Sequence, residues 1–98
     1  MGGSGRVGRS SALSQGQVLL LLFSTARTAV GAGSMTWPVP PEGTSVRDLL
    51  ADLVRVHPRL KPILPQSRCF HDGNAVTRLD ERVRPGEELA IHPPYGGG

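Results

Sequence analysis

Two apolar segments with different spacing determine the architecture expected for this chain. Residues 18–23 (VLLLLF) are apolar without alternation, which is typical of a central strand covered on both faces. Periodicity alone does not separate such a run from a buried helix segment, but its shortness and the turn-like residues around it favour a strand. Residues 44–57 instead repeat their apolar side chains at helical spacing. The face is formed by Val46, Leu49, Leu50, Leu53 and Val54. The pattern therefore predicts one main helix that lies across a sheet.

Signals at both ends support this helix. Ser45, followed three residues later by Asp48, is typical of an N-terminal cap, and the aspartate suits the positive end of the helix dipole. Pro58 blocks continuation at the other end. Arg55 and His57 lie near the negative end of the dipole, so we interpret His57 as a helix-end residue rather than a metal ligand.

Short strands separated by proline- and glycine-containing turns account for the rest of the pattern. In chain order we expect a turn or short glycine-closed helix at 24–30, an edge strand at 35–39, a proline-rich loop at 59–67, strands at 68–71 and 74–77 around an Asp72-Gly73 hairpin turn, a polar connection at 79–84, a turn at 85–88 and a last strand at 89–91. The last strand can pair beside the first in the centre of the sheet. This order predicts an α+β domain with a mixed sheet of four to five strands.

The C-terminal residues form a second distinctive segment. The glycines at 96–98 have no Cβ and give a thread that can enter a narrow cleft in an extended form. Pro93 and Pro94 fix φ and remove two N–H donors, so a strand that arrives through residues 89–91 ends there. A glycine-rich end is often without function. The stiff exit and the ending at Gly98 nevertheless favour a chemically useful terminal carboxylate.

The composition divides the chain into three parts. Residues 1–16 are rich in glycine, serine and arginine, so we expect a disordered leader, followed by a domain at 17–94 and a flexible glycine tail at 95–98. The leader and the apolar run after it imitate a secretory signal, but the run is short and its removal would delete the best strand candidate. Nothing approaches the ~20 apolar residues of a membrane span. Arg6 also occupies the position where a myristoylation pattern requires Ser or Thr.

Charge, cysteine and histidine content argue against several other classes. The net charge of +3 includes Arg6 and Arg9 of the leader, so residues 17–98 carry nine basic and eight acidic side chains. Neither a phosphate-binding stripe nor an aromatic stacking platform is visible, so we expect no nucleic-acid partner. The single cysteine, Cys69, excludes an internal disulfide and fits a reducing, cytoplasmic location; we interpret it as a half-buried strand residue. His71 and His92 have no second ligand at helical or knuckle spacing, so no metal site is expected.

Four pieces of the chain carry a resemblance to a known family. They are the opening strand with its small-residue turn (LLLLFSTARTAVG), the helix with its His-Pro-x-Leu close (TSVRDLLADLVRVHPRL), the segment PGEELAIHPP and the ending PPYGGG. In this order and spacing the chain resembles the ubiquitin-like β-grasp sulfur carriers of the MoaD and ThiS type, and most closely the MoaD-type small subunit of molybdopterin synthase. The resemblance covers residues 17–98. This chain departs from the family pattern at two places. The family usually has Val-Asn-Gly where this chain has residues 71–74 (HDGN), and the family often has a small or polar residue where this chain has Gly96.

The resemblance implies chemistry at the terminal carboxylate of Gly98. In the family, a MoeB-type adenylyltransferase uses ATP to adenylate this carboxylate, and a sulfur donor protein displaces AMP to leave a thiocarboxylate. The tail then enters a MoaE-type large subunit, in a heterotetramer, and donates sulfur to cyclic pyranopterin monophosphate during molybdenum cofactor biosynthesis. The catalytic side chains belong to the partners. The carrier binds no cofactor, and the adenylate and thiocarboxylate are covalent intermediates.

The resemblance also implies a role for each residue of the tail. Gly97 and Gly98 line the narrow passage of the partner, Gly96 allows a bend, and Pro93, Pro94 and Tyr95 seat the root of the tail, with Tyr95 as an anchor at the interface.

Other functions remain open from the residues. A carrier for thiamin thiazole or cysteine synthesis would use the same tip, but the helix-closing residues 57–60 (HPRL) and the double proline favour the molybdopterin branch. A modifier joined to other proteins by isopeptide bonds would also use it. A non-carrier β-grasp binding module would instead recognise a partner through its sheet and would tolerate loss of Gly97 and Gly98.

Overall fold

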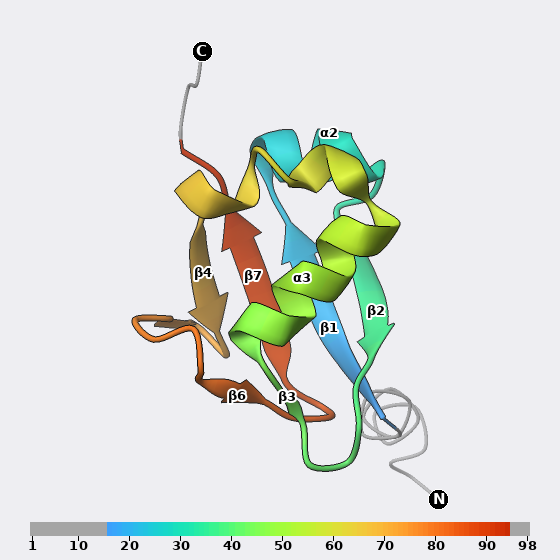
Figure 1. Ribbon diagram of the computed structural model, residues 1–98, viewed down its shortest axis with the longest axis vertical. Coiled ribbons are helices and arrows are strands. Elements are labelled where there is room, and N and C mark those ends of the chain that lie inside the picture. The colour runs from blue at the N-terminus through green and yellow to red at the C-terminus, as the bar shows by residue number, and fades with distance from the viewer. Residues whose placement is uncertain (1–15, 95–98) are drawn as a thin grey trace, which may run out of the picture.

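A computed structural model describes residues 16–94 of the chain. Seven strands, two α-helices and two short 3₁₀ helices occur in this part (Figure 1). In chain order they are β1 (Gln17–Leu22), α2 (Ser24–Val30), β2 (Ser34–Pro38), β3 (Thr44–Ser45), α3 (Val46–Val56), η1 (Pro58–Leu60), η2 (Leu64–Gln66), β4 (Arg68–His71), β5 (Asn74–Ala75), β6 (Arg82–Val83) and β7 (Glu88–His92).

The main sheet has five strands in the order β2-β1-β7-β4-β5. β1 and β7 are parallel neighbours, and the other pairs are antiparallel. α3 crosses one face of this sheet (Figure 1). The α+β class, the mixed sheet and the single main helix are thus confirmed, and so is the central position of the last strand beside the first.

The first strand is not covered on both faces, which corrects one expectation from its apolar run. Val18, Leu20 and Leu22 are buried beneath α3, whereas Leu19 and Leu21 point to the opposite face and are half-buried. Successive strand residues alternate between the two faces, and in residues 16–94 no helix covers the second one (Figure 1). Leu19 and Leu21 are therefore apolar residues on a face that these elements leave open.

α3 begins and ends as predicted. The backbone N–H of Asp48 donates a hydrogen bond of 3.0 Å to Oγ of Ser45, the N-cap residue, and His57 is the C-cap. Val46, Leu49 and Leu53 are fully buried against the sheet. The other two residues of the predicted apolar face, Leu50 and Val54, are only partly buried, because the helix is turned so that one margin of this face lies beyond the sheet.

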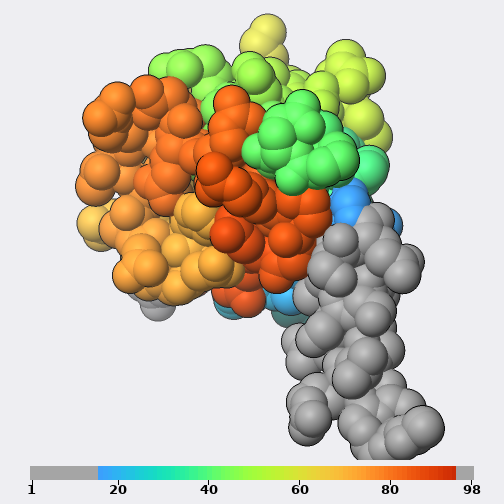
Figure 2. Space-filling view, turned by 90° about the horizontal axis from the view of Figure 1, so that it is seen from below, coloured from blue at the N-terminus to red at the C-terminus, as the bar shows by residue number. Residues whose placement is uncertain are grey.

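A small second sheet corrects the expectation of a polar connection at 79–84. β6 pairs antiparallel with β3, immediately before α3, and its residue Val83 is fully buried. Figure 2 shows this end of the molecule, where the loop before α3 lies against the segment that precedes β7. A two-residue strand with a single buried side chain has no usable periodicity, so the pattern of the sequence could not reveal it.

Gly43 makes this junction possible. Its φ of +84° is left-handed, and a Cβ at this position would lie 2.5 Å from the carbonyl oxygen of Val83. The guanidinium of Arg82 also donates a hydrogen bond of 3.0 Å to the carbonyl of Gly43. The two segments therefore approach closely because one of them has no side chain.

Most of the other local predictions are confirmed, although β5 covers only Asn74–Ala75 of the strand expected at 74–77. α2 is a short helix that ends at Gly31 with φ +90°, and β4 and β5 flank a turn in which Asp72 and Gly73 both have positive φ. The proline-rich segment contains η1 and η2, and Leu60 and Leu64 from these turns enter the core. None of the helices in residues 16–94 has the length and apolar character that a membrane span requires.

The boundaries of the domain expected at 17–94 stay predictions, and this domain lies within the described residues. The leader lies outside them except for Gly16, whose carbonyl accepts a hydrogen bond of 2.7 Å from the N–H of Val39. The predicted tail, residues 95–98, also lies outside.

Candidate functional site

The predicted tail comes directly after the central strand of the sheet. β7 pairs with β1 on one side and with β4 on the other, and Arg68 lies opposite His92 in the register. The N–H of Phe23 donates a hydrogen bond of 3.2 Å to the carbonyl of Ile91, so pairing continues to the end of the strand. The root of the tail is therefore held from both sides.

The two prolines after β7 lie where the sequence predicted the strand to stop. The strand ends at His92, Pro93 is buried and Pro94 is exposed. The chain thus reaches the surface at Pro94, soon after the end of β7, which points toward the C-terminus in Figure 1. Tyr95, Gly96, Gly97 and Gly98, the remaining predicted site residues, lie outside the described residues, so their roles stay predictions.

An aromatic cluster lies beside this exit, on the sheet face opposite α3. The rings of Phe23 and His92 stack with centroids 4.2 Å apart and planes 14° from parallel. Phe70 meets the same imidazole edge-on at 5.1 Å. Both are favourable ring geometries. Phe23 remains 40% exposed, a large fraction for a phenylalanine, so the cluster is open to solvent on one side.

The cluster continues into a shallow groove along three strands. Leu21, Ala90 and Phe70 lie side by side in the register of β1, β7 and β4, and Arg68 and Glu88 border them. The groove has a volume of about 480 Å³. We call the surface formed by Leu21, Phe23, Phe70, Ala90 and His92 the outer face. An apolar surface that continues to the root of the tail is suited to bind a protein partner that also takes up the tail.

Sequence reasoning did not identify the outer face as part of the site. A signal was nevertheless present, because alternation along β1 puts Leu21 on the side opposite Leu20 and Leu22. The uninterrupted apolar run concealed it, since such a run is also typical of a strand buried on both faces. The stacking of Phe23 on His92 joins residues far apart in the sequence and depends on the parallel pairing of β1 and β7.

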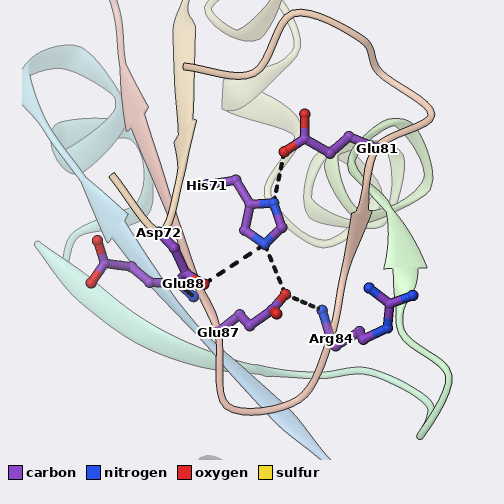
Figure 3. A network of polar contacts seen from close by, with 6 residues as sticks. All are labelled: His71, Asp72, Glu81, Arg84, Glu87 and Glu88. Atoms are coloured by element: carbon purple, nitrogen blue, oxygen red, sulfur yellow. Dashed lines mark hydrogen bonds and ion pairs between the residues drawn. The ribbon is translucent and has the colours of Figure 1, made fainter. Parts of the chain in front are cut away.

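A cluster of polar residues lies at the opposite end of the sheet. Nδ1 of His71 lies 2.7 Å from Oε2 of Glu81, and Nε2 lies 2.7 Å from Oε1 of Glu87 (Figure 3). Asp72 adds a carboxylate oxygen 4.0 Å from Nε2. The Glu87 carboxylate also accepts a hydrogen bond of 2.8 Å from the backbone N–H of Arg84. Only the imidazolium form can donate to carboxylates from both ring nitrogens.

The charges of this cluster shift the pKa values of two of its members. Partial burial alone would lower the pKa of His71, but the hydrogen bonds to Glu81 and Glu87 outweigh it and raise this pKa above the ordinary histidine value. Burial likewise acts to raise the pKa of Glu87, but the hydrogen bonds from the Arg84 backbone and His71 outweigh it and lower the value. Each group therefore favours the charged form of its partner.

The same cluster is the place to consider a metal. His71, Asp72 and Glu87 each offer one ligand atom, and these atoms lie within 4.8 Å of one another. Both nitrogens of His71 are already hydrogen-bonded to carboxylates, however, so the cluster is electrostatically satisfied as an ion-paired clasp that joins the end of β4 to the residues just before β6 and β7. We assign it that structural role. The expectation that the chain binds no metal or cofactor stays a prediction.

The remaining candidates have structural roles. His57 caps α3 and lies 6.3 Å from the Trp37 ring, as expected for a helix-end residue. Cys69 is half-buried in β4, also as expected, and burial raises the pKa of its thiol to about 11. The thiol is therefore neutral near pH 7 and poorly suited to act as a nucleophile.

Comparisons with known proteins agree with this geometry. The model of the ThiS family matches residues 20–98. A molybdopterin synthase sulfur carrier subunit from Chlamydomonas reinhardtii is 30% identical over 83 residues, which cover 84% of this chain and 99% of that protein. The crystal structure of SAMP1 from Haloferax volcanii matches with a TM-score of 0.72 and 27% identity, and the match covers 85% of this chain and 100% of SAMP1.

A further match concerns a chain that was solved in a complex of two subunits. A chain in the complex of subunits 1 and 2 of the molybdopterin-converting factor from Helicobacter pylori matches with a TM-score of 0.61 and 16% identity, and the match covers 84% of this chain and 99% of that one. This likeness concerns the fold alone. The family model spans nearly the whole domain and the predicted tail, and the Chlamydomonas relative matches over nearly its full length. The chain therefore belongs to the ThiS family.

Proposed function

We propose that this chain is the sulfur carrier subunit of a molybdopterin synthase. The observation that carries the proposal is the position of the exit, because the central strand delivers the chain to the surface beside an apolar face that no helix of residues 16–94 covers. The 30% identical relative, which is matched over 99% of its length, is a molybdopterin synthase sulfur carrier subunit and supports the same conclusion.

The reacting group is the terminal carboxylate of Gly98. A carboxylate is a poor electrophile, so an adenylyltransferase of the MoeB type first joins one of its oxygens to the α-phosphate of ATP and releases pyrophosphate. The terminal sulfur of a persulfide on a donor protein then attacks the carbonyl carbon, and AMP leaves with that oxygen. A thiol cleaves the S–S bond of the resulting acyl disulfide and forms a disulfide with the donor sulfur, so that the terminus carries a thiocarboxylate. This chain supplies the reacting end, and the activating and transfer enzymes supply the catalytic side chains.

The outer face and the tail act together in this proposal. A MoaE-type large subunit binds the outer face through apolar contacts, which fixes the root of the tail at His92 and Pro93. Gly98 is only four residues beyond Pro94, so the bound outer face keeps the reacting carboxylate near the large subunit. Binding far from the reacting atom thereby contributes to orientation at the reacting atom.

A direct test is to convert the terminal carboxylate to a thiocarboxylate in vitro. The full chain is incubated with a MoeB-type adenylyltransferase, ATP and a sulfur donor, and its mass is measured. We expect the exchange of one oxygen for sulfur, located at Gly98 by fragmentation. The loaded chain mixed with a MoaE-type large subunit should then convert cyclic pyranopterin monophosphate to molybdopterin. An unchanged mass, or full activity of a chain without Gly97 and Gly98, would contradict the proposal.

A protein-modifier function is the second candidate, and one observation favours it. SAMP1, a small archaeal modifier protein, has the same fold at 27% identity and is covered over its whole length. A modifier needs the same adenylated glycine but transfers it to a lysine of another protein. The appearance of this chain in isopeptide linkage, without conversion of the pterin precursor, would favour the modifier function.

A further inference from the structure

A second groove lies on the other side of the sheet, away from the outer face. It has a volume of about 610 Å³ and runs between α3, the η2 turn and the β4-β5 hairpin with the segment after it. Its apolar lining includes Leu50, Val54, Leu64, Cys69, Val76 and Leu79. We call it the helix-side groove. Neither the tail exit nor the aromatic cluster takes part in it, so it needs a separate explanation.

The groove exists because the apolar stripe of α3 is wider than the sheet surface it covers. Leu50 and Val54 belong to that stripe but are only partly buried, and Leu79 is 47% exposed. Apolar side chains that remain partly exposed around one depression are unfavourable in water. Binding of a partner here would remove this apolar surface from water.

Backbone hydrogen bonds hold the walls in place. The N–H of Arg47 donates to the carbonyl of Leu79 at 2.9 Å, and the N–H of Val76 donates to the carbonyl of Cys69 at 2.8 Å. The hydroxyl of Ser67 also donates a hydrogen bond of 2.8 Å to the carbonyl of Ile63. The groove is thus preformed, which lowers the entropic cost of binding.

The charges at the groove select the kind of partner. Arg47, Lys61 and Arg68 line its margins, and none of its described lining residues is acidic. Within residues 16–94 none of these three cations has a carboxylate within 4.0 Å, because the ion pairs there involve Arg55, Arg78 and His71. Asp80, which lies in the field of Arg47, is itself paired with Arg78 at 2.9 Å. The margin therefore presents unpaired positive charge around an apolar floor.

We propose that the helix-side groove binds an acidic amphipathic segment of a partner protein. Apolar side chains of that segment cover Leu50, Val54 and Leu79, and its carboxylates pair with Arg47 and Lys61. A small ligand fits less well, because most of the lining is apolar and, apart from the three cations, its polar side chains are only Ser67, whose hydroxyl donates to the Ile63 carbonyl, and Thr77. The leader of this chain is also unsuited, since it carries Arg6 and Arg9 and no acidic residue.

This inference does not depend on the sulfur-carrier function. The helix-side groove and the outer face lie on opposite sides of the main sheet, and the two hollows share only Arg68, at their common border. A partner in the helix-side groove thus leaves the aromatic cluster and the tail accessible. The chain can bind two proteins at once, one that uses its terminus and one that holds the body.

The test uses the full chain and a set of fluorescent peptides of defined pattern. Each peptide has leucines at helical spacing i, i+3 and i+7 flanked by glutamates, and a matched peptide has lysine in place of every glutamate. We expect saturable binding of the acidic peptides alone, weakened by added salt. In the double variant Lys61→Glu, Arg47→Glu, the affinity for the acidic peptides should fall at least tenfold. The same variant should bind the lysine peptide. Arg27→Glu and Arg59→Glu, which change exposed cations outside the groove, should change the affinity for the acidic peptides less than twofold.

Amide chemical shifts locate the bound peptide. We expect changes at Leu50, Val54, Val76 and Leu79 and none at Phe23 or His92. The proposal is overturned if no acidic peptide binds saturably at millimolar concentration, if the lysine peptides bind equally well, or if the shifts map to the outer face. It is also overturned if the chain dimerises in solution and Leu79→Ala abolishes the dimer, because the occupant is then a second copy.

Discussion

Phe23 and His92 stack face to face at 4.2 Å, although one comes just after the first strand and the other ends the last. Parallel pairing of β1 with β7 brings the two residues to the same end of the sheet. This is also the end from which the chain leaves through Pro93 and Pro94. The ring contact therefore joins the outer face directly to the root of the tail, and a partner that binds the two rings also positions that root.

The first prediction tests the outer face as the surface that binds the large subunit. Phe23→Ala removes a ring that is 40% exposed and stacked on His92. We expect its affinity for a MoaE-type large subunit to fall by roughly 10- to 100-fold, as for an aromatic residue at the centre of an interface. Isothermal titration calorimetry measures the change, and thermal unfolding measures any loss of stability.

Val56→Ala is the matched control, since Val56 is also exposed and apolar but lies at the end of α3. It should leave the affinity unchanged. If both variants bind like the unmodified chain, the large subunit does not use the outer face and is bound through the tail alone.

The second prediction concerns the clasp at the other end of the sheet. His71 stabilises the folded chain as an imidazolium that donates to Glu81 and Glu87. Its pKa is raised on folding, so its contribution is complete below the unfolded histidine pKa of about 6.5 and is lost as pH rises through the folded pKa. Glu87, whose pKa is lowered on folding, loses its contribution on the acidic side, as pH falls below about 4.3 toward its folded pKa.

Urea unfolding of the unmodified chain and of His71→Gln checks this from pH 5 to pH 9. We expect the unmodified chain to be more stable near pH 5.5 by on the order of 1 kcal/mol. The difference should shrink as pH rises to 9, because neutral histidine can donate only one hydrogen bond. A difference that stays constant over this range would show that His71 acts by packing rather than by charge.

The third prediction tests the close approach at Gly43. Gly43→Ala brings a Cβ to within 2.5 Å of the Val83 carbonyl oxygen at a residue whose φ is +84°. We expect a loss of about 2–4 kcal/mol in the free energy of unfolding, from the strained backbone and the displaced β3-β6 pair together. Gly31→Ala is the matched control, because φ is +90° there and nothing lies within 4 Å of the added Cβ.

The control should lose only about 1–2 kcal/mol, the cost of the left-handed conformation by itself. The gap between the two variants then measures the steric contact with Val83. Equal losses would mean that β6 moves away from Gly43 at little cost.

Local signals determined much of this protein. The cap at Ser45, the apolar spacing of α3, the Asp72-Gly73 turn and the proline stop after His92 each act within a few residues, so the elements they define could be predicted. The order of these elements then led to a mixed sheet with one crossing helix and a tail placed after the central strand.

Tertiary structure decided the features that depend on contacts between distant residues. The two-residue pair of β3 and β6, the clasp of His71 with Glu81 and Glu87, and the stacking of Phe23 on His92 have no local signature. The same holds for the two grooves, because an apolar residue in a strand or helix does not reveal which of its faces the rest of the fold will cover. Local sequence specifies the elements through short-range sterics and hydrogen bonds, whereas the surfaces available to partners depend on how completely those elements cover one another.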